Sequence, residues 1–393
     1  MIKLLIAEWH KFRCRRFWRF LTVILIIVML YWADGYFKLY PNVNPTNIEL
    51  YRQMRINTQM IYENQINLIQ EFENKETLSE SETAQLSLYR TSAENNKAIY
   101  LEYLSLERAL ASQKWLKANQ ILQQIESRNN NNDTANELIR QYLIDNNLPT
   151  VLLSTISTGT IAGYLNYLVY EKIWLVFSVI GLLCGFDLIN DERRTGSLKT
   201  TFTQPYKRSH IFVAKISIRI IAAVIIILST LITTIGILAF NHSLALFHIP
   251  VLYSPLTLSG FQAVFSTVDV MPFLRFFTLN LLHGILNCCF IIALCGFCCL
   301  FVRSSTLNFS VLLITLLTVR IGFVQKSLPA IFSQTPLFYL FHDVLYYQTN
   351  DYQAIYYTYR DVSYHYGLLI LLISSVGLTA AGAFLIKRKD NFI

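Results

Sequence analysis

Six long apolar stretches constrain this chain more than any other feature of its sequence. A helix that crosses the roughly 30 Å hydrocarbon layer of a membrane needs about 20 mostly apolar residues. The stretches that approach or exceed this length are Phe17–Trp32, Ile173–Ile189, Ile211–Phe240, Phe276–Val302, Leu307–Val324 and Gly367–Ile386. Only 15% of the 393 residues are charged, against roughly 25% in a typical soluble domain. The sequence therefore predicts an all-α integral membrane protein with six transmembrane helices.

The placement of Lys and Arg predicts which end of each stretch faces the cytoplasm, because short cytoplasmic segments retain these residues. Positive charge gathers in four segments that fall on one side of the membrane if the chain crosses it six times. These residues are Lys3, Lys11, Arg13, Arg15, Arg16 and Arg19, then Arg193, Arg194, Lys199, Lys207 and Arg208, then Arg303, and finally Lys387, Arg388 and Lys389. We expect a multi-pass protein of the cell membrane with both termini in the cytoplasm.

The first apolar stretch could also belong to a cleaved signal peptide. It is followed by YWADGYFKLY and not by a small-residue cleavage site, so we expect a permanent anchor. Before it, apolar residues repeat at helical spacing, which predicts a helix on the inner membrane surface. A merely basic flank is the alternative. The apolar residues are Ile2, Leu5, Ile6, Trp9 and Phe12, with Lys3, His10 and Lys11 on the other side.

A large polar insertion separates the first two stretches. Residues 34–165 contain 11 Lys or Arg and 15 Asp or Glu, so the insertion carries a net charge of −4 and the rest of the chain +12. Patterned segments without internal Gly or Pro predict extracytoplasmic helices over Asn47–Asn74, Ser79–Ser127 and Thr134–Ile144. Ser79 and Glu82 form a capping box at the start of the second. The insertion either forms an antiparallel hairpin that receives substrate or docks another subunit, or is a solvated helical cap.

The expected domains follow from this organisation. Residues 1–33 form the interfacial helix and first transmembrane helix, residues 34–165 the extracytoplasmic helical domain, and residues 166–393 transmembrane helices two to six. The cytoplasmic connection at 190–208, between the second and third stretches, is the most strongly patterned segment. Glu192 favours the positive end of a helix, Leu198 and Phe202 form a small apolar face, and Pro205 ends the element.

The order of residues in this connection resembles the signature of ABC-2 type permeases, read as E-x-x-x-G-(T/S)-L-(K/E), then P-x-x-R, then a Lys entering the next helix. The matching residues are Glu192, Gly196, Leu198, Lys199, Pro205, Arg208 and Lys215. In that family the segment includes a coupling helix that sits in a cleft of the ATPase subunit. An ordinary basic loop is the alternative, but it explains the charges and not the placement of Glu, Gly and Pro. With Phe202, these residues form the expected ATPase-coupling loop.

No phosphate-binding loop or hydrolase motif occurs in the sequence. The pair Cys295 and Cys298 forms a C-x-x-C within an apolar stretch, where packing is the expected role and a metal site is not. We therefore expect no catalytic residue, cofactor or metal on this chain and no nucleic-acid partner, with ATP bound by a separate subunit.

Polar residues within the apolar stretches are the candidates for a substrate pathway. His283 and Asn287 lie one turn apart in the fourth stretch, and Arg320 lies in the fifth. They either line a polar route or form hydrogen bonds between helices. Asp187 and Arg219 are expected to form a structural pair beneath the loop. The segment Leu328–Tyr347, broken by two prolines, is expected to be an interfacial or re-entrant element.

The resemblance implies a permease subunit of an ATP-driven ABC exporter that moves an amphipathic substrate, peptide or lipid-like, outward. The expected partners are an ABC ATPase subunit, a second permease copy in a homo- or heterodimer, and membrane lipid. Two alternatives come from other classes. A membrane-anchored sensor or receptor would bind a ligand through the extracytoplasmic helical domain but would need a cytoplasmic signalling domain. An intramembrane enzyme would need paired catalytic groups.

Overall fold

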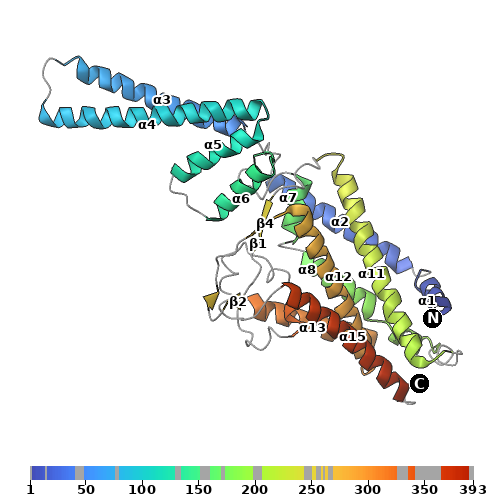
Figure 1. Ribbon diagram of the computed structural model, residues 1–393. Coiled ribbons are helices and arrows are strands. Elements are labelled where there is room, and N and C mark those ends of the chain that lie inside the picture. The colour runs from blue at the N-terminus through green and yellow to red at the C-terminus, as the bar shows by residue number, and fades with distance from the viewer. Residues whose placement is uncertain are drawn as a thin grey trace. The chain divides into compact units, whose positions relative to one another are not determined.

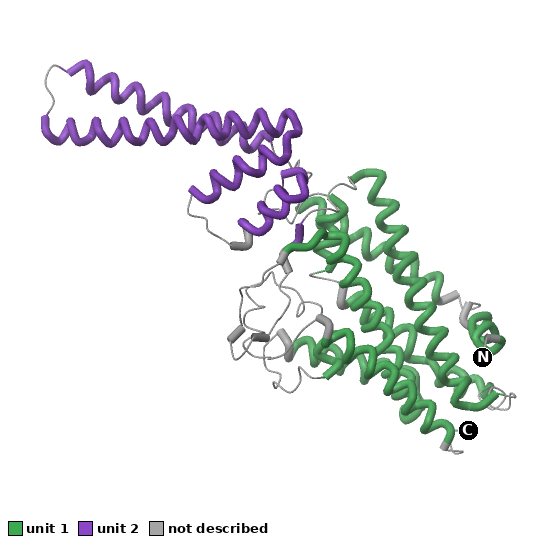
Figure 2. Tube along the Cα trace, in the orientation of Figure 1, with its two compact units in different colours: residues 1–39, 159–247, 252–393 green, residues 40–158, 248–251 purple. Residues whose placement is uncertain are grey.

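The computed structural model describes residues 2–13, 16–39, 48–75, 79–128, 134–150, 160–169, 173–197, 206–242, 250–253, 258–259, 262–263, 269–324, 335–340 and 364–388. The chain divides into two compact units (Figure 2). Unit 1 contains residues 1–39, 159–247 and 252–393, and unit 2 contains residues 40–158 and 248–251.

Unit 1 is a helical bundle (Figure 1). Its helices are α1 (Ile2–Arg13), α2 (Arg16–Leu39), α7 (Ile161–Tyr167), α8 (Ile173–Gly185), α9 (Asn190–Arg194), α11 (Arg208–Leu238), α12 (Phe273–Cys298), α13 (Ser305–Val324) and α15 (Tyr364–Arg388), with a 3₁₀ turn, η4, at Phe338–Leu340. The described short strands of the chain are β1 (Pro250–Tyr253), whose first two residues belong to unit 2, and β2 (Leu258–Ser259), β3 (Gln262–Ala263) and β4 (Asp269–Pro272) of unit 1. Strand β2 pairs antiparallel with β3.

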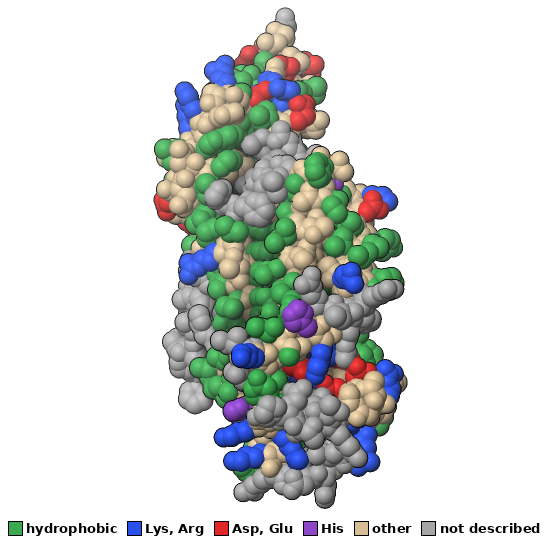
Figure 3. Space-filling view, turned by 90° about the vertical axis from the view of Figure 1, so that its right-hand side faces the viewer, with side chains coloured by type: hydrophobic (Ala, Val, Ile, Leu, Met, Phe, Trp, Pro, Cys, Tyr) green, Lys and Arg blue, Asp and Glu red, His purple; other side chains and the backbone are tan. Residues whose placement is uncertain are grey.

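Four described helices are long and apolar enough to cross a membrane: Trp18–Leu39, Arg208–Leu238, Phe273–Cys298 and Tyr366–Lys387. They coincide with four of the six predicted stretches, and a shorter apolar segment, Ser305–Ile321, falls in the fifth. The remaining stretch contains α8, which has 13 residues, so the count of six crossings stays a prediction. On the face seen in Figure 3, hydrophobic side chains predominate in the middle of the view, and Lys and Arg side chains are frequent at its lower end and occur near its top as well. The chain is a helical membrane protein.

The first apolar helix continues beyond its predicted end at Trp32, because α2 runs to Leu39. The polar residues that suggested a boundary are accommodated within the helix. Asp34 and Lys38 form an i, i+4 ion pair of 2.6 Å, while Ala33 and Tyr36 are buried. The Tyr164 hydroxyl donates a hydrogen bond of 2.6 Å to the Met29 carbonyl, which joins α7 to α2.

The helices α8 and α12 pack closely because glycines allow their backbones to approach. A Cβ atom added to Gly185 would lie 2.6 Å from Cβ of Cys295, and one added to Gly284 would collide with the Phe177 ring. Small residues are the usual means of close packing between membrane helices. Cys184 and Cys288 are free thiols buried in the same region, in keeping with a packing role.

Unit 2 contains α3 (Ile48–Glu73), α4 (Glu80–Ala111), α5 (Trp115–Arg128) and α6 (Thr134–Asp145). Polar contacts show that α3 and α4 form an antiparallel hairpin: Arg55 pairs with Glu107 at one end and Glu73 with Arg90 at the other. The helical prediction for this segment is confirmed, with one correction. The single predicted helix Ser79–Ser127 is wrong, because α4 and α5 are separated at Gln113, whose φ of 54° breaks the helix without a Gly or Pro.

The predicted capping box at the start of α4 is confirmed. The Glu82 amide donates to the Ser79 hydroxyl, and the Ser79 amide donates to the Glu82 carboxylate over 2.9 Å. Lys75 and these bonds to Ser79 lower the pKa of Glu82 to about 2, so the carboxylate stays charged at neutral pH.

Ser79→Ala is expected to fray the first turn of α4, since loss of an N-cap costs about 1 kcal/mol. Hydrogen exchange of the amides in that turn should become roughly fivefold faster. Ser87→Ala, at an exposed position within the same helix, is the control and should leave these rates unchanged. Equal exchange in both variants would contradict a stabilising role for the box.

Candidate coupling site

The connection that follows α8 begins with α9, a short helical turn that carries Glu192. Acidic residues are favoured in the first turn of a helix, where unpaired amides give a positive end. Asn190 and Glu192 are nevertheless buried, at 1% and 9% exposure. Their side chains are therefore engaged inside the chain instead of being presented to solvent.

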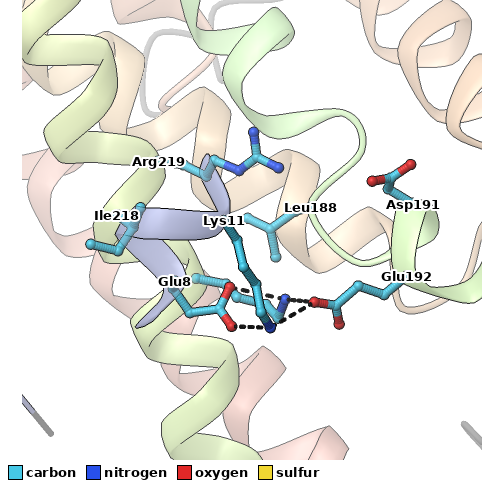
Figure 4. A pocket seen from close by; sticks show the side chains of 8 residues that line it. Glu8, Lys11, Leu188, Asp191, Glu192, Ile218 and Arg219 are labelled. Carbon is cyan, nitrogen blue, oxygen red and sulfur yellow. Dashed lines mark hydrogen bonds and ion pairs between the residues drawn. The ribbon is translucent and has the colours of Figure 1, made fainter. Parts of the chain in front are cut away.

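Glu192 belongs to a group of four charged side chains that contact one another (Figure 4). Lys215 Nζ, from α11, lies 2.5 Å from Glu192 Oε1 and 3.3 Å from Glu8 Oε2. Lys11 Nζ lies 2.8 Å from Glu8 Oε1 and 3.6 Å from Glu192 Oε1. We call Glu8, Lys11, Glu192 and Lys215 the ionic cluster. Its two carboxylates and two ammonium groups balance, which is the condition under which buried charges are tolerated.

The ionic cluster brings together three segments that are far apart in the sequence. Glu8 and Lys11 belong to α1, Glu192 to α9 and Lys215 to α11. Leu4 anchors α1 beside them: it is 1% exposed and packs against Ile211 and Ala214 of α11. A displacement of α9 must therefore act on both α1 and α11.

The prediction of an N-terminal helix is confirmed, whereas its position on the inner membrane surface stays a prediction. The side of the helix that packs against the protein is not the predicted apolar face. The protein-facing side carries Leu4 and Glu8, whereas Ile6 is 53% exposed. Sequence reasoning missed Glu8 as a site residue. The available signal was its isolation, because it is the only acidic residue before Asp34 in a strongly basic segment.

The charges of the ionic cluster shift the pKa values of the two residues in α1. Burial acts to raise the pKa of Glu8, but Lys215 and Lys11 outweigh it and hold that pKa below its ordinary value. Burial acts to lower the pKa of Lys11, but Glu8 and Glu192 outweigh it and raise that pKa. Both residues are therefore charged at neutral pH.

These shifts predict how the attachment of α1 depends on pH. Because the pKa of Glu8 is lowered in the folded protein, its charged carboxylate stabilises the attachment of α1 at pH values above 4.5, the ordinary pKa. This stabilisation is lost as the pH falls through the pKa that Glu8 has in the folded protein. Because the pKa of Lys11 is raised in the folded protein, its charged ammonium group stabilises the attachment of α1 at pH values below 10.5. This stabilisation is lost as the pH rises through the pKa that Lys11 has in the folded protein. Hydrogen exchange in α1, corrected for its intrinsic rate, should be constant between these limits and should increase below about pH 4. An increase between pH 6 and 8 would contradict this assignment.

A second set of polar contacts ties α9 to the end of α12. Arg193 Nη1 donates to the Cys299 carbonyl over 2.8 Å and to Asn190 Oδ1 over 3.2 Å. Asn308 Nδ2, near the start of α13, donates to the Phe186 carbonyl over 3.1 Å and to Cys299 Sγ over 3.1 Å. The turn before α9 is therefore joined to α12 and α13 as well.

The predicted pair beneath the loop is confirmed. Arg219 Nη2 lies 3.0 Å from Asp187 Oδ1, and the Arg219 guanidinium lies 5.4 Å from the centre of the Trp18 ring, a cation–π contact. This pair links the base of the connection to α11 and α2.

The structure describes only part of the predicted coupling loop. Glu192 and Lys215 are brought into direct contact, Gly196 follows α9, and Arg208 begins α11. Gly196 has φ of +73°, and an added Cβ would meet nothing within 4 Å among the described residues. Its requirement for glycine is therefore conformational. The predicted residues Leu198, Lys199, Phe202 and Pro205 lie outside the described residues.

The candidate pathway residues lie elsewhere in unit 1. His283 and Asn287 are fully buried on α12 and bond to backbone carbonyls at η4: His283 Nε2 lies 2.7 Å from the Tyr339 oxygen, and Asn287 Nδ2 donates to that of Leu340 over 3.2 Å. These contacts agree with the helix-bonding alternative, although the acceptor is η4 and not a long helix. Arg320 lies on another helix, α13.

A comparison with known protein families matches residues 4–391 to the family described as ABC-2 family transporter protein. The match spans nearly the whole sequence and includes every residue of the ionic cluster. The chain belongs to the ABC-2 transporter family. No curated protein and no solved structure matches this ABC-2 permease.

Membership in the ABC-2 transporter family indicates which kind of subunit this chain associates with. An ABC-2 permease is the transmembrane component of an ABC transporter, and the family implies association with an ABC ATPase subunit. Among the described residues of this ABC-2 permease, no group of three or more His, Cys, Asp or Glu side chains could hold a metal ion.

Proposed function

We propose that the chain is the permease subunit of an ATP-driven exporter and that residues 190–208 couple it to a separate ATPase. The observation that carries the proposal is the ionic cluster, in which Glu192 of the coupling loop bonds Lys215 at the entrance of α11 over 2.5 Å. A partner that hydrolyses ATP can move the membrane helices only through an element shared with them. The turn at α9 is joined to α1, α11 and α12 and is suited to that role.

The loop divides into two parts with different roles. Gly196, Leu198 and Phe202 form the docking part that engages the ATPase, with apolar anchors and a turn. Glu192 is the transmitting part, because its carboxylate is bonded inside the chain. Single substitutions can test this division. Those in the docking part should weaken binding of the ATPase, whereas substitution of Glu192 should remove the stimulation of ATP hydrolysis while the ATPase stays bound.

The remaining partners follow from the family. We infer that two permease copies, identical or related, form a pathway for an amphipathic peptide or lipid-like substrate, which moves outward when two ATPase chains hydrolyse ATP. The permease lies in the cell membrane with both termini in the cytoplasm, and unit 2 lies outside. The basic segments at both termini and beside α9 support this orientation.

The orientation is tested by labelling intact cells with a membrane-impermeant thiol reagent. Asn131→Cys and Gln348→Cys are expected to react from outside, whereas Ser197→Cys is expected to react only after permeabilisation. The parent protein, with its seven native cysteines, provides the background signal. Reaction of Ser197→Cys in intact cells would refute the orientation and the coupling role with it.

Co-purification tests the proposed partnership itself. A phosphate-loop ATPase encoded next to this chain is expected to purify with it and to hydrolyse ATP faster when both are in one membrane. Purification without the ATPase, together with unaltered hydrolysis after reconstitution, would contradict the proposal.

A further inference from the structure

A pocket in unit 1 lies between α2, α8 and α11, away from the ionic cluster. The space between its walls amounts to about 360 Å³, a value that includes the part open to the surroundings. Its walls are Met29, Leu168, Val176, Phe177, Ile180, Ile227, Thr230 and Leu231. None of these residues is charged, so the pocket suits an uncharged and largely apolar group.

One polar group interrupts this apolar lining. Thr230 is 2% exposed, and its hydroxyl oxygen makes no hydrogen bond to any residue that the structure describes. A Thr hydroxyl in a helix commonly donates to the carbonyl four residues earlier, here Ile226. That carbonyl instead accepts a hydrogen bond of 3.0 Å from the Ser229 hydroxyl. The Thr230 hydroxyl is thus left available to a ligand.

The pocket lies on the protein-facing side of α11. Ile227, Thr230 and Leu231 are buried on that side. Ile225 and Leu228, on the opposite side of the same helix, are 47% and 38% exposed. Ordinary contact with bulk lipid explains the exposed side but not a buried hydroxyl within an apolar pocket.

We propose that this pocket binds a hydrocarbon chain that carries an uncharged carbonyl group, such as an ester or an amide. The chain packs against Met29, Phe177 and Ile227, and the carbonyl oxygen accepts a hydrogen bond from Thr230. This chemistry satisfies both features of the pocket, because burial stabilises the apolar chain and the hydroxyl gains an acceptor. Two sources could supply a hydrocarbon chain with such a carbonyl group: a membrane phospholipid and an acylated amphipathic cargo.

Photolabelling of the full-length permease tests the proposal. The protein is reconstituted in phosphatidylcholine vesicles that contain either a phosphatidylcholine with a diazirine on one acyl chain or an N-acyl amide with the same group. Labelled residues are then located by mass spectrometry. We expect at least one probe to label Met29 or Phe177 in a saturable manner, and to label Leu228 only in proportion to probe concentration.

Three variants make the result specific. Ile227→Trp fills the pocket and should reduce the saturable labelling about tenfold, whereas Ile225→Trp, on the exposed side of α11, should not change it. Thr230→Val keeps the shape of the side chain and removes the hydroxyl. It should lower occupancy about fivefold, the factor expected from one neutral hydrogen bond.

Adding the ATPase subunit and ATP distinguishes whether the bound hydrocarbon chain comes from a membrane lipid or from a transported molecule. Loss of pocket labelling during hydrolysis identifies a transported amphipath, and unchanged labelling identifies a resident lipid; both outcomes support the site. The proposal is overturned if neither probe labels Met29 or Phe177 above the level at Leu228, or if Ile227→Trp leaves that labelling intact. Binding is measured without the ATPase, so the pocket and the coupling role can fail independently.

Discussion

Glu192→Lys is expected to abolish the permease-dependent stimulation of ATP hydrolysis while leaving the protein at normal abundance in the membrane. The substitution places a third cation beside Lys215 and Lys11, whose Nζ atoms now lie 2.5 and 3.6 Å from the Glu192 carboxylate. Only Glu8 would remain to balance them. Breaking a buried ion pair by changing one partner costs about 3–5 kcal/mol, enough to detach α9 from α1 and α11.

Arg194→Ala provides the matched control for this first prediction. Arg194 also belongs to α9, but its side chain is 83% exposed where it pairs with Asp191. Exposed pairs contribute about 0–1 kcal/mol, so stimulation should stay within roughly fivefold of the parent. The prediction fails if both variants stimulate hydrolysis equally.

Gly196→Val is expected to weaken ATPase binding, which is a different defect from loss of coupling. Gly196 has φ of +73°, a conformation that costs about 1–2 kcal/mol for a residue with a Cβ atom and more for a β-branched one. The turn that presents the docking part of the loop should therefore be lost. We expect at least tenfold weaker association in a pull-down with the purified ATPase.

Gly196→Asn separates conformation from size. Asn adopts positive φ values far more readily than Val, and open space surrounds the position among the described residues. Association should therefore remain close to that of the parent. Equal loss in both substitutions would show that the side chain itself obstructs docking. Leu198→Asp, which places a charge on the predicted apolar anchor, should weaken association as Gly196→Val does.

Much of the fold was predictable because membrane crossing imposes a simple pattern on the sequence. Long apolar runs specified four of the spans, and the Ser79–Glu82 spacing identified the start of α4. The failures have local physical causes. The predicted end of the first span at Trp32 ignored an Asp34–Lys38 pair that an exposed helix end accommodates. The break at Gln113 was missed because it uses a positive φ at a residue that is neither Gly nor Pro.

The candidate site was predictable in part, through the order of residues in one connection. That pattern identified Glu192 and Lys215 as members of a motif, but not that they bond to each other over 2.5 Å. The participation of Glu8 depends on tertiary packing of α1 against α11. A helical repeat indicates that a helix is amphipathic, but it does not indicate which side packs against the protein when a charged residue is buried. Polar networks that join segments distant in the sequence are therefore the part of the site that is hardest to predict from the sequence.

A charge-swap experiment tests the coupling role of the ionic cluster most directly. Permease-dependent ATP hydrolysis is measured in proteoliposomes for Glu192→Lys, for Lys215→Glu and for the double variant, at equal amounts of bound ATPase. The double variant keeps opposite charges across the 2.5 Å contact and leaves the 2.8 Å contact between Glu8 and Lys11 untouched. It also sets like charges across the 3.3 Å contact to Glu8 and the 3.6 Å contact to Lys11. Each single variant leaves the four-residue cluster with a net charge of two, and we predict that it loses at least tenfold in stimulation. The double variant balances the four charges again, so it should recover part of the lost stimulation. A double variant no better than the poorer single variant, or single variants as active as the parent, would contradict the transmission of ATPase movement through this cluster.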